Sequence, residues 1–273
     1  GLTDCNYVGV FLTFCCNYRC SYCINQHSGR PHSSGNLSAE QWIAAFNRLE
    51  PPGDLPITLQ GGEPTLHGEF YELINGIDES INIDLLTNMQ FDVEDFCSKI
   101  PPHRLRRQAP YASIRVSFHP EVMDLQETID KALAMQRRGY SIGLFGVLHP
   151  KQETVIRDAK QRCGQVGLDF RTKDFLGYYQ GRLYGEYRYP DSVNGKNMQH
   201  VLCRTTELLI DPAGLIYRCH RDLYGGQNAI GSILDQTIPV PGQFRPCRQF
   251  GQCSPCDVKL KNNRFSTIWT LFG

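Results

Sequence analysis

The sequence predicts an α/β protein whose parallel sheet is open or curls towards a barrel, followed by a smaller cysteine-rich region. Short apolar runs of strand length alternate with helical patterns up to about residue 175. Beyond residue 176 the alternation stops, and cysteines become frequent. We therefore expect a core over residues 1–190 and a C-terminal domain over residues 191–273, tail included.

Six runs have the length and composition of strands. They cover residues 8–14, 56–60, 81–88, 112–118, 141–148 and 168–175. Several are almost continuously apolar, which is typical of strands covered on both faces. In such sheets ligands bind at the carboxyl ends of the strands, so we expect the active edge there.

Helical patterns separate the strands. The clearest covers residues 37–50, where Ser38 and Gln41 form a capping box and Trp42 begins an apolar face. Residues 126–138 repeat the pattern and end at Gly139. A third stripe covers residues 153–166.

The region after residue 176 has a different organisation. Residues 177–190 are rich in Tyr, Gly and Arg, which favours a linker packed by aromatic rings over a substrate-binding segment. Residues 205–220 predict a hairpin that turns at Asp211–Gly214.

The composition excludes several classes of protein. Lysine plus arginine and aspartate plus glutamate number 28 each, which argues against a nucleic-acid binder held by phosphate contacts. No apolar run approaches the roughly 18 residues of a membrane helix, and no signal peptide is recognisable. We expect a cytoplasmic protein without a membrane or nucleic-acid partner.

Most of the twelve cysteines lie in two clusters. In a chain without an export signal, such clustering indicates metal binding rather than disulfides. Cys163 lies on an apolar helical stripe and Cys97 in the segment VEDFCSKI, and we expect both to be packing residues. The first cluster contains Cys15, Cys16, Cys20 and Cys23. The second contains Cys203, Cys219, Cys247, Cys253 and Cys256.

The first cluster has the spacing C-x3-C-x2-C at Cys16, Cys20 and Cys23. Structural zinc sites normally need four ligands, often as two C-x2-C pairs. Three thiolates on one short loop suit a [4Fe–4S] cluster instead, because each holds one iron and the fourth iron stays open. Cys15 is adjacent to Cys16 and should point elsewhere, so we assign it to packing.

This cysteine motif, with Tyr22 before its last cysteine and a strand before it, resembles the radical S-adenosylmethionine (SAM) superfamily. The sequence QGGEPT after the second expected strand supports the resemblance. Gly61, Gly62 and Glu63 match the family's GGE motif, which implies that they bind the methionyl amino group of SAM. The resemblance implies a partial (β/α)6 TIM-like barrel, with a [4Fe–4S] cluster and SAM as cofactors.

Three further positions match the family less closely. Asn88 follows the third expected strand, which implies a place near the ribose or the substrate. Ser117 ends the fourth strand, where many members contact the ribose or the methionine carboxylate. His119 stands where many relatives have Asp. It is either a polar catalytic group or a residue that begins a turn before Pro120.

The second cluster resembles the C-terminal extension called SPASM, or its shorter twitch form. The match implies Cys203, Cys219, Cys253 and Cys256 as ligands of an auxiliary [4Fe–4S] cluster. Cys247 is a spare that could replace Cys253. Considered alone, this half of the chain could also be a zinc knot.

The resemblance implies reductive cleavage of SAM and removal of a substrate hydrogen by the 5′-deoxyadenosyl radical, with flavodoxin or ferredoxin as electron donor. An auxiliary cluster with four cysteine ligands would accept the substrate's electron, so a net oxidation of a small molecule is expected.

A peptide-modifying enzyme is the alternative. The first strand starts near residue 8, which leaves no room for a leader-binding domain and favours a small molecule. Six arginines between residues 171 and 221 hint at a sugar-like or anionic substrate. A zinc-bearing scaffold is the third hypothesis.

Overall fold

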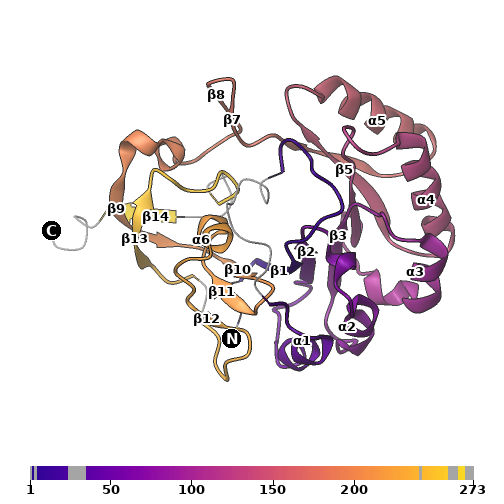
Figure 1. Cartoon of the computed structure of the whole chain (residues 1–273), viewed down its shortest axis with the longest axis horizontal. Helices are drawn as coiled ribbons and strands as arrows, with labels where there is room; N and C mark the ends of the chain where they lie inside the picture. Colours follow the sequence, from indigo (N-terminus) through magenta and orange to yellow (C-terminus); the bar gives the residue numbers. More distant parts are fainter. Residues whose placement is uncertain (1, 3–4, 24–34, 240–241, 258–263, 268–273) are drawn as a thin grey trace.

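A nine-stranded sheet forms the centre of the computed structural model, with strand order β12-β11-β10-β1-β2-β3-β4-β5-β6 (Figure 1). The structure describes residues 2, 5–23, 35–239, 242–257 and 264–267. From β10 to β6 every neighbouring pair is parallel, and the β10–β11 and β11–β12 pairs are antiparallel. The mainly parallel half-barrel predicted from the sequence is confirmed.

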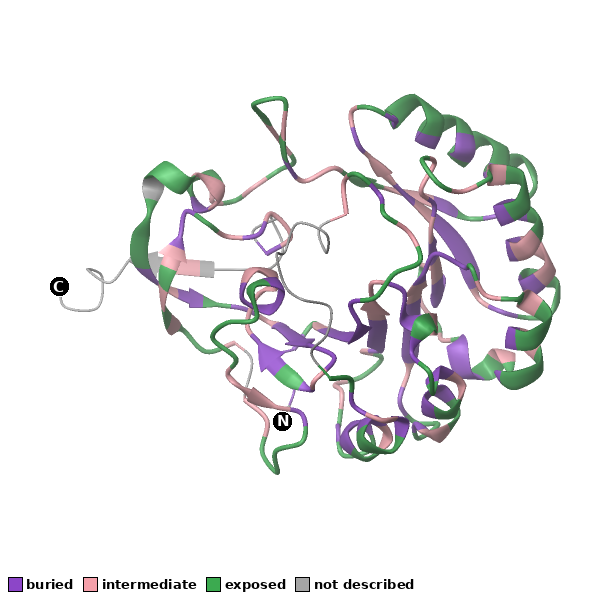
Figure 2. Cartoon of the chain, in the orientation of Figure 1, coloured by how far each residue is buried: buried purple, intermediate pink, exposed green. Residues whose placement is uncertain are grey.

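The six predicted strands are all present. They are β1 Tyr7–Thr13, β2 Ile57–Gly61, β3 Ile83–Thr87, β4 Ile114–Ser117, β5 Ile142–Leu148 and β6 Phe170–Asp174. Most of their residues are buried, as the apolar runs indicated. Figure 2 shows this burial concentrated in the sheet and on the helix surfaces that face it.

Five helices connect these strands and lie along the outer side of the sheet (Figure 1). They are α1 Ala39–Phe46, α2 Phe70–Gly76, α3 Val93–Lys99, α4 Leu125–Arg137 and α5 Glu153–Gln165. The capping box of Ser38 and Gln41 is present, and Gly139 follows α4 with φ +91°. The sequence analysis did not identify α2 or α3. Short 3-10 helices lie at η2 Pro64–Leu66, η3 Pro102–Leu105, η4 Pro190–Val193 and η5 Gly195–Asn197.

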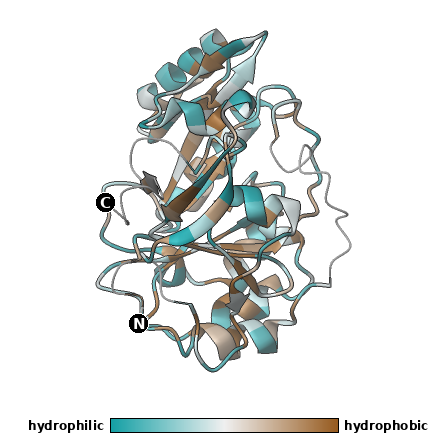
Figure 3. Ribbon diagram, turned by 90° about the vertical axis from the view of Figure 1, so that its left-hand side faces the viewer, coloured by the Kyte–Doolittle hydropathy of each residue, from teal (hydrophilic) through white to brown (hydrophobic). Residues whose placement is uncertain are grey.

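Apolar side chains fill the space between the helices and the sheet. Trp42, Phe46, Phe70 and Phe96 are among the largest buried side chains of this core. In Figure 3, brown hydrophobic residues are frequent in the strands, and teal hydrophilic residues are frequent on the helices. Cys163 is fully buried in the core, which confirms its packing role.

The inner surface of the half-barrel carries a charged layer. Asp84 is fully buried and accepts hydrogen bonds from Arg107 Nε at 3.0 Å and Arg115 NH2 at 3.1 Å. Leu86 lies two residues after Asp84 on β3, and Ser117 lies two residues after Arg115 on β4. Both Leu86 and Ser117 line the cavity at the carboxyl ends of the strands, which is described below. Because side chains two apart on a strand share a face, this ion network lies under that cavity.

The C-terminal strands belong to two sheets. The predicted hairpin is present as β10 Glu207–Ile210 and β11 Leu215–Tyr217, with Gly214 at φ +79° in the turn. It is followed by α6 His220–Gly225 and β12 Gly231–Ser232. β10 pairs with β1, so the large sheet continues past residue 190, and the division of the chain there stays a prediction.

The second sheet has the order β13-β9-β14, from β9 Gln199–Arg204, β13 Arg245–Phe250 and β14 Arg264–Thr267. Residues 177–190 contain a hairpin, β7 Gly177–Tyr179 and β8 Arg182–Tyr184. Its Tyr179 ring packs on His149 at 4.8 Å, and its Tyr184 ring packs on Phe175 at 6.0 Å. Aromatic packing therefore holds this segment to the end of the half-barrel, as expected for a linker.

Candidate active site

A cavity of about 250 Å3 lies at the carboxyl ends of β1–β4. Its walls combine these strand ends, the cysteine loop after β1 and one residue of α6. The lining residues are Phe11, Cys16, Tyr18, Cys20, Tyr22, Cys23, Gln60, Gly61, Gly62, Leu86, Thr87, Asn88, Ser117, His119 and Tyr224. Nine of the ten residues predicted for the N-terminal site line this cavity. The tenth, Glu63, lies behind its wall.

The cysteine loop brings three thiols to the cavity. Cys23 N donates to Cys20 O at 3.1 Å, which closes a turn between the last two cysteines. Burial, together with the charges of Cys23 and Cys16, raises the pKa of Cys20 to about 12. Cys16 and Cys23 thus lie close enough to Cys20 to affect its ionisation, and three such sulfurs form a donor set that fits an iron-sulfur cluster.

Cys15 contributes its backbone. Its carbonyl accepts a hydrogen bond from Glu63 N at 2.8 Å, and its side chain is exposed. A Cβ added at Gly62 would lie 2.1 Å from that carbonyl oxygen, and one at Gly61 would lie 2.1 Å from Thr13 O. The two glycines therefore permit the end of β2 to lie directly against the cysteine loop, a close approach that no other residue allows.

Glu63 is nearly fully buried and connects the ends of β2 and β3. Its Oε1 accepts from the hydroxyls of Thr65 and Thr87, each at 2.7 Å, and its Oε2 accepts from Asn88 N at 2.7 Å. Burial raises its pKa despite these hydrogen bonds. The carboxylate thus orders the loops that carry the other site residues.

Asn88 and Ser117 lie where the resemblance implied, at the ends of β3 and β4, and both line the cavity. The Asn88 amide donates to Asn17 Oδ1 at 2.7 Å and lies 3.8 Å from Cys16 Sγ. The β3 end is thereby connected to the cysteine loop.

His119 lines the cavity and pairs with Tyr22. The Tyr22 hydroxyl and His119 Nδ1 are 2.7 Å apart. Burial lowers the pKa of His119 to about 4 and raises that of Tyr22 above its usual value. The hydrogen bond therefore joins a neutral phenol and a neutral imidazole.

Sequence reasoning did not identify several cavity residues. Phe11, Gln60 and Leu86 face inward from β1, β2 and β3, and strand alternation could have indicated them. Tyr224 comes from α6, more than 200 residues after β1, and no local signal predicts its position.

Four C-terminal cysteines lie close to one another around β9 and β13, namely Cys203, Cys219, Cys247 and Cys253. Cys203 pairs directly with Arg245, and Cys247 pairs with Val201, so both cysteines lie on one face as diagonal neighbours. Burial and the charges of Cys247 and Cys253 raise the pKa of Cys203. Cys219 precedes α6, and its sulfur accepts from Asp222 N at 3.4 Å. The spare Cys247 thus lies beside predicted ligands.

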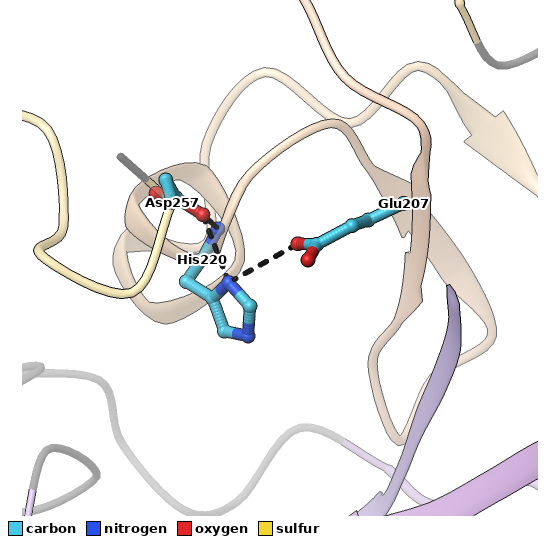
Figure 4. A group of neighbouring side chains, drawn as sticks. All are labelled: Glu207, His220 and Asp257. Carbon is cyan, nitrogen blue, oxygen red and sulfur yellow. Dashed lines mark hydrogen bonds and ion pairs between the residues drawn. The ribbon is translucent and has the colours of Figure 1, made fainter. Parts of the chain in front are cut away.

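An ion-pair network lies next to these cysteines (Figure 4). Asp257 Oδ1 accepts from the backbone N of His220 at 2.7 Å and contacts His220 Nδ1 at 2.8 Å. Glu207 Oε2 lies 3.9 Å from the same Nδ1. Ligand atoms of these three residues lie within 4.8 Å of one another. Because Asp257 follows Cys256 and His220 follows Cys219, the network connects the two cysteine segments.

Three of the six arginines that hinted at an anionic substrate are hydrogen-bonded to other parts of the chain. Arg171 donates to Asp169 and to the Pro110 carbonyl, Arg218 to Asp222 and the Pro246 carbonyl, and Arg221 to Gln249 and Gln252. No lysine or arginine occurs among the described residues that line the cavity. This hint therefore finds no support in the cavity walls.

Comparison with known proteins gives one family match and several partial ones. Residues 10–124 match the model of the radical SAM superfamily. Segments of the chain are 44% identical over 63 residues to the sporulation killing factor maturation protein SkfB of Bacillus subtilis, and 29% identical over 92 residues to 7-carboxy-7-deazaguanine synthase of Clostridium acetobutylicum. These segments are 23% and 33% of this chain, and they span only 15% and 41% of those two relatives.

Two solved structures share the fold. Native anSMEcpe with bound AdoMet and Cp18Cys peptide superposes with a TM-score of 0.58 at 17% identity, over 85% of this chain and 78% of that chain. Streptococcus suis SuiB bound to precursor peptide SuiA gives a TM-score of 0.52 at 14% identity, over 84% of this chain and 62% of that chain. No helix in the described part of this chain combines the length and apolar character needed to cross a membrane. Within this chain, residues 10–124 form the segment that matches the radical SAM superfamily.

Proposed function

We propose that this protein is a radical SAM enzyme that holds a [4Fe–4S] cluster on Cys16, Cys20 and Cys23. The observation that carries the proposal is that all three thiols line one cavity with Gly61 and Gly62. When bound, this cluster supplies the electron that cleaves SAM to methionine and a 5′-deoxyadenosyl radical, which removes a hydrogen atom from the substrate.

The chain's own residues bind and orient SAM and exclude water from the cavity. The backbone of Gly61 and Gly62 offers polar groups to the methionyl part of SAM, while Asn88 and Ser117 offer hydrogen-bonding side chains to its ribose or carboxylate. Phe11 and Tyr224 close the cavity with apolar surface, their rings 5.8 Å apart. Excluding water protects a reactive radical from side reactions.

Cys203, Cys219, Cys253 and Cys256 are the proposed ligands of an auxiliary [4Fe–4S] cluster. Support comes from the SPASM-like spacing and from the gathering of cysteines around β9 and α6. A cluster with four thiolate ligands would take the electron left on the substrate, so the net reaction is an oxidation. Flavodoxin or ferredoxin is the proposed electron donor.

We take a small metabolite as the first substrate candidate, because the cavity at the strand ends has a volume of only about 250 Å3. A peptide is the second candidate. It is favoured by the 44% identity of a 63-residue segment to SkfB, whose name describes a maturation protein.

The proposal is tested with protein purified and reconstituted under anaerobic conditions. We expect about eight irons per chain for two clusters, and formation of 5′-deoxyadenosine on reduction with dithionite in the presence of SAM. Changing Cys16, Cys20 and Cys23 together to alanine should abolish this product. Cys15→Ala is the matched control, because the structure uses only the backbone of Cys15. Zinc without iron, or product formation by the triple variant, would refute the assignment.

The substrate class is tested separately. Metabolite and peptide fractions of a cell extract are added to the reduced enzyme, and 5′-deoxyadenosine is measured above the level without addition. Stimulation by the metabolite fraction supports the first candidate, and stimulation by the peptide fraction alone supports the second.

A further inference from the structure

The segment between Cys20 and Cys23 is held by residues that lie about 100 positions later in the chain. Ser21 donates twice to the carboxylate of Glu121: its backbone N to Oε2 at 2.8 Å and its hydroxyl to Oε1 at 2.6 Å. These hydrogen bonds lower the pKa of Glu121, so the carboxylate is charged. Hydrogen bonds to an ionised carboxylate are among the stronger ones in proteins.

The next residue of the loop is held from the same side. The Tyr22 hydroxyl forms a 2.7 Å hydrogen bond with His119 Nδ1, and the Tyr22 ring stacks on His149 with centroids 5.5 Å apart and planes at 22°. His149 in turn packs edge-on against Phe175 at 4.6 Å. Tyr22 is therefore fixed at its hydroxyl and across its face.

The anchoring residues belong to a rigid turn. The His119 carbonyl accepts from Val122 N and Met123 N, each at 3.0 Å, and Phe118 N donates to Phe145 O of β5 at 2.8 Å. The turn after β4 is thus closed on itself and continuous with the sheet. A contact with this turn therefore fixes the position of the cysteine loop relative to the sheet of the half-barrel.

We propose that His119 and Glu121 form a clamp on Ser21 and Tyr22 that fixes Cys20 and Cys23, and that its role is to retain the iron-sulfur cluster. The inference rests on the proposed function, because it concerns the same cysteines. It makes His119 a positioning residue, which acts through Tyr22.

The test is the rate at which reconstituted protein loses iron to a ferrous chelator. Tyr22→Phe keeps the ring and removes only the hydroxyl, while His119→Ala removes the hydrogen-bonding partner of that hydroxyl. Each variant should release iron from the first cluster about three- to tenfold faster than the unaltered protein, the loss expected for one hydrogen bond. The double variant should be no faster than either single one, because both break the same contact.

Matched controls separate the clamp from general effects. His103→Ala removes an exposed histidine on η3, and Glu153→Gln removes an exposed carboxylate on α5; both should release iron at the original rate. Glu121→Gln should accelerate release, since the charged acceptor is lost. His119→Asn should restore slow release, because its side-chain amide, which can donate or accept, can replace Nδ1 as the partner of the Tyr22 hydroxyl. If His119→Ala does not fold, Tyr22→Phe still tests the contact.

A second readout distinguishes positioning from chemistry. In the clamp variants, the electron paramagnetic resonance signal of the reduced first cluster should broaden and respond less to added SAM. Unchanged iron release and spectra with a lowered kcat in His119→Ala would overturn the clamp. Protein that binds no iron at all would refute the proposed function instead. Iron binding and 5′-deoxyadenosine formation, with variants that release iron normally, would refute the clamp alone.

Discussion

Replacing Gly62 with alanine should break the contact between the cysteine loop and the end of β2. The new Cβ would lie 2.1 Å from the carbonyl oxygen of Cys15, 2.5 Å from its carbonyl carbon and 2.7 Å from Phe14 O. All three atoms are backbone atoms, so no side-chain rotation relieves the overlap. The cysteine loop has to move by about 1 Å to reach ordinary van der Waals contact.

Two costs follow from that displacement. Overpacking of this kind destabilises proteins by about 1–3 kcal/mol. The Glu63 N to Cys15 O hydrogen bond, 2.8 Å long, is also strained or lost, which adds about 1–3 kcal/mol when its donor stays buried. Together these effects correspond to a fall in melting temperature of about 5–15 °C for a protein of this size.

Gly164→Ala is the matched control, because the added methyl group has free space there. Gly164 lies in α5, and a Cβ there meets nothing within 4 Å. Alanine in a helix is favoured over glycine by up to about 1 kcal/mol, so this variant should melt slightly higher. Thermal melting and iron content of both variants are measured on anaerobic protein. A Gly62→Ala protein with unchanged melting temperature and full iron content would refute the close-approach argument.

Three further substitutions test other parts of the molecule. Asp84→Ala removes the buried carboxylate that pairs with Arg107 and Arg115, and among the described residues only Arg107 keeps another carboxylate, Asp54. It should cost up to about 3–5 kcal/mol of stability, measured by denaturation; an unchanged midpoint contradicts this. Glu63→Gln replaces one accepting carboxylate oxygen by an amide NH2, which cannot accept a hydrogen bond from the neighbouring donors. The variant should lose about 1–3 kcal/mol of stability in the same assay, and a normal midpoint would contradict this. Asp257→Ala should disconnect the segments of Cys219 and Cys256 and reduce bound iron to about half. Full iron content in that variant would show that the network around His220 does not support the second cluster.

Local patterns were sufficient for much of the fold. The six strands are signalled by apolar runs, and α1 by a capping box, because these features depend on side chains close in sequence. Helices α2 and α3 contain only seven residues each, too short for a helical period to stand out from the surrounding sequence.

The candidate site was predictable where its residues follow strand ends. The triple cysteine, Gly61 and Gly62 sit at fixed places after β1 and β2, and parallel strands bring such positions to one edge. The role of Glu63 was not predictable in the same way. Its three hydrogen-bonding partners depend on how the end of β3 packs behind the cavity wall.

What the sequence alone determined is the chemistry of the donors: which residues carry sulfur, their spacing on the loop, and the order of strands that places them at the active edge. Only the tertiary structure decided the pairings across the sheet. It brings His119 to Tyr22, Glu121 to Ser21 and Tyr224 into the cavity wall. The physical reason is that these contacts join residues about 100 or more positions apart, whose meeting depends on strand register and packing and leaves no periodic trace along the chain.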